Sequence, residues 1–165
     1  MKFLIAHFQK HSERKRFDFF WRITLESLLL SSVISALASF AQFKEREFEG
    51  RELPHDSFWL WAVAIVVGAP VLETIVFQMI PTEIMRLLKT KLWLQIAVCT
   101  ALFCILHAFE DVGLGLAAGL VGGFYLAFTY VHWRDRNWWT ATWMTIVSHA
   151  IGNAVALAMM IYGAS

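Results

Sequence analysis

Long apolar stretches separated by short polar ones organise this sequence. Three stretches contain no Asp, Glu, Lys or Arg between their ends: Glu26 to Lys44, Asp111 to Arg134 and Arg136 to Ser165. A helix of about 20 residues crosses a hydrocarbon layer of about 30 Å. The pattern predicts five spans, at residues 21–43, 58–80, 92–109, 112–132 and 138–162. Because backbone groups in lipid must be satisfied internally, we expect an all-α, multi-pass transmembrane helical bundle.

Composition supports a membrane protein. Hydrophobic residues make up 58% of the chain and charged residues only 16%, which is more apolar than a soluble domain. The net charge of +1 leaves no basic face for nucleic acid. We therefore expect the lipid bilayer, and no nucleic acid, as a partner. The two cysteines, Cys99 and Cys104, lie in one apolar run and are expected to be buried small hydrophobes.

The basic residues predict the orientation. An inner amino terminus places eleven Lys and Arg residues on the inner side and three on the outer side. We expect residues 1–20 to be a basic cytoplasmic arm and residues 21–165 to be a single membrane-embedded helical domain, in the cytoplasmic membrane if the source is bacterial. His7 and His11 share a helix face on the arm, and without further ligands we expect them to be solvated.

Four polar residues interrupt the apolar spans, where ionisable groups are costly. Glu73 and His107 are each 17 residues from residue 90, the expected tip of a hairpin between the second and third spans. Antiparallel helices then bring them to a similar level. His149 and Asn153 are four residues apart and share one face of the last helix. The pattern predicts one polar cavity, although each residue alone is compatible with a packing role.

Such a cavity suits the hydrolysis of an amide in or beside the membrane. A carboxylate in a poorly hydrated site can act as a general base, and a neighbouring imidazole can orient and activate a water. A second imidazole and an asparagine amide can donate to the oxyanion that forms when the water attacks a peptide carbonyl.

In order and spacing these residues resemble the CPBP family of intramembrane glutamic endopeptidases, which contains CAAX proteases and bacteriocin-processing enzymes and is also called Abi. The family pattern Phe-x-x-x-His is present from Phe103 to His107, and His-x-x-x-Asn from His149 to Asn153. Glu73, in the run APVLETIVFQ, matches the first glutamate of Glu-Glu-x-x-x-Arg. The resemblance covers about residues 68–157. It implies that Glu73 and His107 activate the water and that His149 and Asn153 form the oxyanion hole.

The first motif departs from the family pattern at two positions. Thr74 stands where a second glutamate is expected, and Gln78 where an arginine is expected. With Phe103, they are expected to support the site. The resemblance implies no metal and no cofactor, and a membrane-associated peptide or protein as the substrate.

Three alternatives stay open. One glutamate and two histidines also suit a zinc site, which predicts sensitivity to chelators. The altered first motif also suits a catalytically inactive relative that acts as a membrane immunity or peptide-binding scaffold protein. A channel or transporter would need a polar stripe through the whole layer, whereas these polar residues cluster.

Overall fold

The computed structural model describes residues 2–40 and 57–163, and these residues form helices joined by short turns. Five helical segments in this part of the chain are long and apolar enough to span a membrane, which confirms the expected bundle. Those segments are Arg16–Ala38, Phe58–Leu87, Leu92–Glu110, Val112–Arg134 and Trp138–Ile161. The elements in chain order, with η for a π-helical stretch, are α1 (Lys2–Ser12), α2 (Arg16–Phe40), α3 (Phe58–Val63), η2 (Ala64–Gly68), α4 (Ala69–Glu73), η3 (Thr74–Met79), α5 (Ile80–Leu87), α6 (Leu92–Glu110), α7 (Val112–Leu114), η4 (Gly115–Gly122), α8 (Gly123–Arg134) and α9 (Trp138–Gly163).

Two spans have different bounds from those predicted. The first helix begins at Arg16, earlier than residue 21, and Asp18 in its first turn pairs with Arg14 and Arg22 four residues away on either side. Such pairs stabilise a helix end. The second span continues past Pro81 to Leu87, because the proline follows a π-helical stretch instead of ending the helix.

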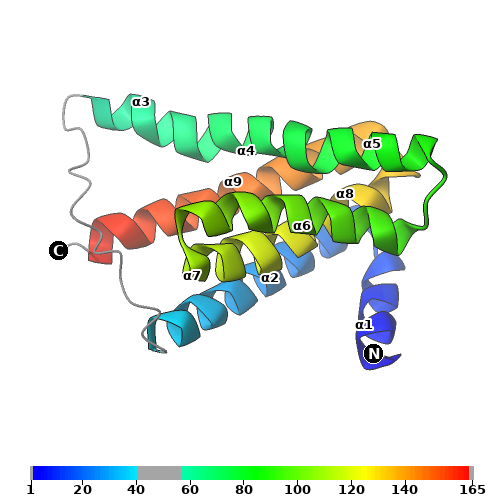
Figure 1. Cartoon of the computed structure of the whole chain (residues 1–165), viewed down its shortest axis with the longest axis horizontal. Helices are drawn as coiled ribbons and strands as arrows, with labels where there is room; N and C mark the ends of the chain where they lie inside the picture. The colour runs from blue at the N-terminus through cyan, green and yellow to red at the C-terminus, as the bar shows by residue number, and fades with distance from the viewer. Residues whose placement is uncertain (1, 41–56, 164–165) are drawn as a thin grey trace.

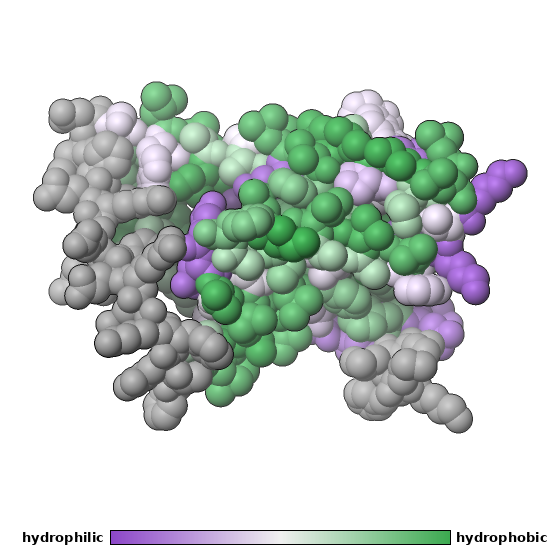
Figure 2. Space-filling view, in the orientation of Figure 1, coloured by the Kyte–Doolittle hydropathy of each residue, from purple (hydrophilic) through white to green (hydrophobic). Residues whose placement is uncertain are grey.

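The long helices run in broadly similar directions, while α1 runs across them (Figure 1). In the space-filling view, hydrophobic residues cover most of the middle of the bundle, and the strongly hydrophilic ones gather mainly toward its ends (Figure 2). Large apolar side chains are correspondingly exposed, such as Leu60, Leu72 and Ile105. An apolar surface of this extent is suited to contact with lipid tails.

An aromatic core joins α2, α8 and α9 at one end of the bundle. Phe19 and Tyr130 are fully buried in it. Trp133 also belongs to this core and is only 4% exposed. A tryptophan at the end of a membrane span usually places its amphipathic ring at the lipid–water interface. Instead, the guanidinium groups of Arg16 and Arg136 lie 5.9 and 5.1 Å from the Trp133 ring centroid, within the range of a cation–π interaction.

Helix α1 docks on the bundle, so the expectation of two solvated histidines is wrong. The His11 ring is buried, and its Nε2 lies 3.0 Å from Glu26 Oε2 on α2. His7 Nε2 lies 2.6 Å from the other carboxylate oxygen. Burial of the ring holds the pKa of His11 below its ordinary value, against the opposing effect of the Glu26 charge.

Glycines on η4 and α8 allow close packing against α6. A Cβ atom added at Gly119 would lie 2.8 Å from the Cys104 Cα, and one at Gly123 would lie 2.9 Å from the Phe103 ring. Small residues at this spacing let two membrane helices approach until their backbones are in contact. The stripe of glycines therefore fixes the distance between α6 and the next span.

We expect Gly119→Ala to destabilise the protein by about 1–3 kcal/mol, because the nearest neighbour is backbone that cannot rotate away. Thermal unfolding in detergent measures the change. Gly68→Ala is the matched control, since a Cβ there would meet no atom of the described residues within 4 Å beyond its chain neighbours and the backbone of its own helix. Equal midpoints for the two variants would contradict the proposed role of the glycine stripe.

Candidate active site

Glu73 lies between two π-helical stretches on the second span. Each stretch is followed within two residues by a proline, Pro70 after η2 and Pro81 after η3. A proline has no N–H and crowds the preceding turn of a helix. Wider turns accommodate both prolines while the span continues, and π-helical turns of this kind are frequent at functional sites.

The first of these turns explains the position of Asn153. At the end of η2, the Ala69 N–H donates to the carbonyl of Ala64, five residues back. In that register the Ile65 carbonyl would accept from residue 70, which is a proline and has no N–H. Asn153 Nδ2 donates to the Ile65 carbonyl at 3.0 Å. The proline therefore frees an acceptor that anchors the asparagine of α9 against η2.

Glu73 and His149, two of the four predicted catalytic residues, lie close to each other. Glu73 Oε2 lies 3.5 Å from His149 Nε2, and the His149 side chain is only 7% exposed. This carboxylate oxygen and His149 Nδ1 are both buried and have no hydrogen-bond partner among the described residues. The pair thus keeps unused donor and acceptor capacity for a water or a substrate.

His107 points toward the same region from α6, with one ring nitrogen committed. Its Nδ1 lies 2.9 Å from the carbonyl of Phe103, one turn earlier on the helix. A carbonyl only accepts, so we assign the proton to Nδ1 and the lone pair to Nε2. Phe103 contacts both imidazoles, which places His107 on the same side of the bundle as the Glu73–His149 pair, and no ion pair within 4.0 Å joins Glu73 to His107 in the described chain.

The Phe103 ring lies between the two imidazoles. Its centroid is 4.3 Å from that of His107 and 5.4 Å from that of His149, and the residue is 2% exposed. The close approach of Gly123 to the Phe103 ring holds it in place. The phenylalanine that the sequence analysis assigned to a supporting role thus contacts both histidine rings.

Thr74 and Gln78 are fully buried on η3. The Thr74 hydroxyl and both polar atoms of the Gln78 amide have no hydrogen-bond partner among the described residues. Unpaired buried polar groups are costly, and both positions carry charged residues in the family pattern. The first motif therefore keeps two neutral polar side chains next to Glu73.

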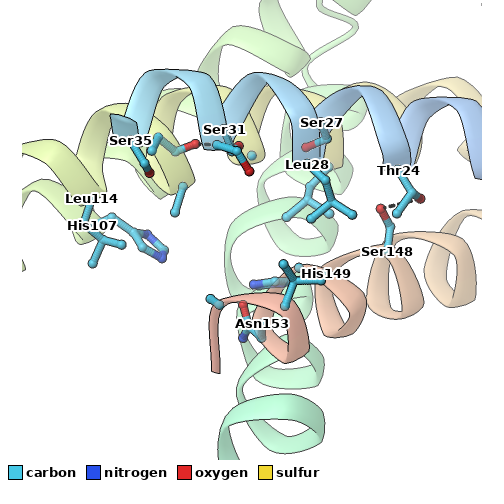
Figure 3. Close-up of a pocket in the computed structure, with 18 of the residues that line it drawn as sticks. Thr24, Ser27, Leu28, Ser31, Ser35, His107, Leu114, Ser148, His149 and Asn153 are labelled. Carbon is cyan, nitrogen blue, oxygen red and sulfur yellow. Dashed lines mark hydrogen bonds between the residues drawn. The ribbon is translucent and has the colours of Figure 1, made fainter. Parts of the chain in front are cut away.

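A cavity of about 270 Å³ lies beside these residues. His107, His149 and Asn153 line one side of it (Figure 3). Glu73 contacts His149 but is not among the residues that line the cavity. The other wall is a polar stripe on α2, formed by Thr24, Ser27, Ser31, Ser32 and Ser35. Ser31 Oγ donates to the Ala117 carbonyl at 2.9 Å, and Thr24 and Ser148 hydroxyls lie 2.9 Å apart.

The sequence analysis missed this polar stripe, which we define as the α2 residues just named. Its signal was present in the spacing, because residues 24, 27, 31 and 35 recur at three or four positions and so share one helix face. Hydroxyl side chains in a span are compatible with ordinary helix packing, so their spacing alone does not predict a cavity.

Comparison with known proteins identifies the family. A family model described as "Type II CAAX prenyl endopeptidase Rce1-like" matches residues 55–155. The matched region contains Glu73, His107, His149 and Asn153, and it excludes α1 and α2. No curated protein and no solved structure gave a significant match. With five apolar helices of membrane-spanning length and this match over more than half of its residues, the chain is an integral membrane protein that belongs to the type II CAAX prenyl endopeptidase Rce1-like family, a family of CAAX-type intramembrane proteases.

Proposed function

We propose that this protein is an intramembrane endopeptidase in which Glu73 and His107 activate a water for attack on a peptide bond. The observation that carries the proposal is the Glu73–His149 contact of 3.5 Å beside a cavity that His107 and Asn153 also face. Ionisable groups are expensive inside a membrane, and pairing around one cavity is their usual arrangement at functional sites.

The reaction begins with a water between the Glu73 carboxylate and His107 Nε2, both of which accept hydrogen bonds in the assigned tautomer. The water oxygen attacks the carbonyl carbon, and Glu73 takes the water proton as the general base. The same glutamate later delivers that proton to the leaving amine nitrogen. Phe103 keeps the His107 ring in position through its carbonyl and its aromatic face.

His149 and Asn153 stabilise the tetrahedral oxyanion. The asparagine amide has two N–H groups, and its bond to the Ile65 carbonyl occupies one of them. The second N–H is left to donate to the oxyanion. While Glu73 is ionised, the N–H at His149 Nε2 is directed at its carboxylate; once Glu73 has taken the water proton, that N–H becomes a further donor to the oxyanion.

The substrate we propose is an extended segment of a membrane-associated peptide or protein. An extended backbone exposes N–H and C=O groups that need partners when they leave water. The polar stripe of α2 lines one wall of the cavity with hydroxyl groups, and the Ser31 hydroxyl, whose proton is donated to the Ala117 carbonyl, keeps its oxygen lone pairs to accept from the substrate backbone. This wall lies outside the family match, so it is where the substrate preference of this protein would differ from that of its relatives.

An inactive relative that binds a peptide in the same cavity is the second candidate. The observation that favours it is the neutral pair Thr74 and Gln78, which replaces a glutamate and an arginine of the family motif. Loss of the arginine removes a cation that can hold a carboxylate in two hydrogen bonds. Such a protein would bind substrate peptides without cleaving them.

The test is incubation of the purified protein in detergent with a pool of apolar and lipidated peptides, followed by mass spectrometry. We expect new amino and carboxy termini, and only the new carboxy termini should gain one ¹⁸O atom when the reaction is run in labelled water. Adding a chelator distinguishes the proposed mechanism from the zinc alternative. The proposed chemistry needs no metal, so peptide cleavage should continue in the presence of the chelator. Peptide retention with no cleavage product would favour the inactive relative.

A further inference from the structure

A second cluster of ligating side chains joins α1 to α2, away from the candidate active site. His7 and His11 lie one turn apart on α1, and Glu26 faces them from α2. Each residue offers one ligand atom, and the three atoms lie within 4.8 Å of one another. The shortest contacts are 2.6 Å from His7 Nε2 to Glu26 Oε1, 3.0 Å from His11 Nε2 to Glu26 Oε2 and 3.2 Å between the two Nε2 atoms.

With Glu26 ionised, protons alone do not satisfy these three contacts together. An ionised carboxylate only accepts, so both imidazoles must donate to it from Nε2, and the two N–H groups then crowd each other at 3.2 Å. If one Nε2 is unprotonated, its lone pair faces a carboxylate oxygen. A cation at the centre would contact all three atoms favourably. His11 Nδ1 is also buried without a hydrogen-bond partner in the described chain, so a proton on that nitrogen gains nothing from hydrogen bonding.

The ligand types indicate which cation fits. Two imidazoles and one carboxylate suit zinc and similar first-row metals, whereas calcium and magnesium prefer oxygen ligands. Ligand atoms around a tetrahedral zinc ion lie about 3.3 Å apart, given bonds of about 2.0–2.1 Å. The contacts of 2.6–3.2 Å approach that spacing, so small side-chain rotations would admit the ion. We propose that His7, His11 and Glu26 form a zinc site that fixes α1 to the first span.

Packing next to the cluster supports a structural role for this site. The Phe8 ring, between the two histidines in sequence, packs against Phe124 at 5.1 Å and Phe128 at 4.8 Å between centroids. The metal would therefore fix a helix that already covers the aromatic core of α8. Neither α1 nor α2 lies in the part of the chain that the family model matches, so the site would be a feature of this chain beyond the family domain.

The test uses the full-length protein in detergent, with any purification tag removed and metals stripped by a chelator. Titration with Zn²⁺, followed by metal analysis after desalting, should give one bound equivalent. Cobalt substitution should give the visible absorption bands of a tetrahedral site. We expect His7→Ala and Glu26→Gln each to weaken zinc binding by more than ~100-fold, beyond the usual effect of changing an outer-shell residue.

His107→Ala is the matched control, because it removes an imidazole from the active-site cavity and should leave zinc binding unchanged. His7 is partly exposed and Glu26→Gln keeps the shape of the side chain, so circular dichroism should show both variants folded. Absence of zinc binding by the wild type would overturn the proposal. His7, His11 and Glu26 would then be held together by shared protons and not by a metal. Binding lost in His107→Ala but retained in His7→Ala would also overturn it, by placing the metal in the cavity. Peptide cleavage is not a readout here, so failure of this site leaves the proposed peptidase untouched.

Discussion

Replacing Glu73 with Gln should reduce kcat for peptide cleavage by about 10²–10⁴-fold, the usual contribution of a general base. The amide keeps the size of the side chain and its contact with His149, but it cannot take a proton from water. The measurement is the initial rate of product formation by mass spectrometry at saturating peptide. The apparent affinity for the peptide should change little, because Glu73 is not among the residues that line the cavity.

Glu13→Gln is the matched control for this prediction. It makes the same chemical change at an exposed position between α1 and α2, and it should leave the rate unchanged. His107→Ala should lower kcat as well, since Nε2 of that ring is the second acceptor for the water. Equal product profiles for wild type and Glu73→Gln would remove the peptidase assignment and leave the peptide-binding relative.

The spans could be predicted from sequence because hydrocarbon thickness sets their length and charged residues mark their ends. The alignment of Glu73 with α6 was also predictable, because the turn falls close to residue 90, where Lys89 has a left-handed φ of 52°. The continuation of the second span to Leu87 could not be predicted from the sequence. A proline ordinarily ends a helix, and only the three-dimensional structure shows that a π-helical turn precedes it.

The far wall of the cavity and the docked α1 helix could not be predicted for a different reason. Both depend on which face of one helix meets another helix, and that contact is set by packing between segments distant in sequence. The polar stripe of α2 and the pair His7 and His11 have the spacing of a helix face. Spacing alone does not identify a partner such as Glu26, which lies 15 positions beyond His11. Buried polar partners appear only once the helices are placed.

Replacing Asn153 with Ala should lower kcat by about 10²–10³-fold, the typical effect of losing one oxyanion-hole donor. KM should change less, because the donor acts on charge that develops only during attack. The variant also loses the bond to the Ile65 carbonyl, which would leave a buried acceptor unpaired and cost about 1–3 kcal/mol of stability. Thermal unfolding in detergent measures that second effect separately from the rate.

Thr145→Val is the control that separates stability from catalysis. The Thr145 hydroxyl is fully buried on the same helix, and within the described part of the chain it bonds only to the Ala141 carbonyl, one turn earlier, at 2.8 Å. Its loss should alter the unfolding midpoint without changing kcat. A rate loss in Asn153→Ala no larger than that in Thr145→Val would mean that the asparagine acts only as the anchor between α9 and η2. In that case the oxyanion would depend on His149 alone, and His149→Ala should then cause the larger loss in kcat.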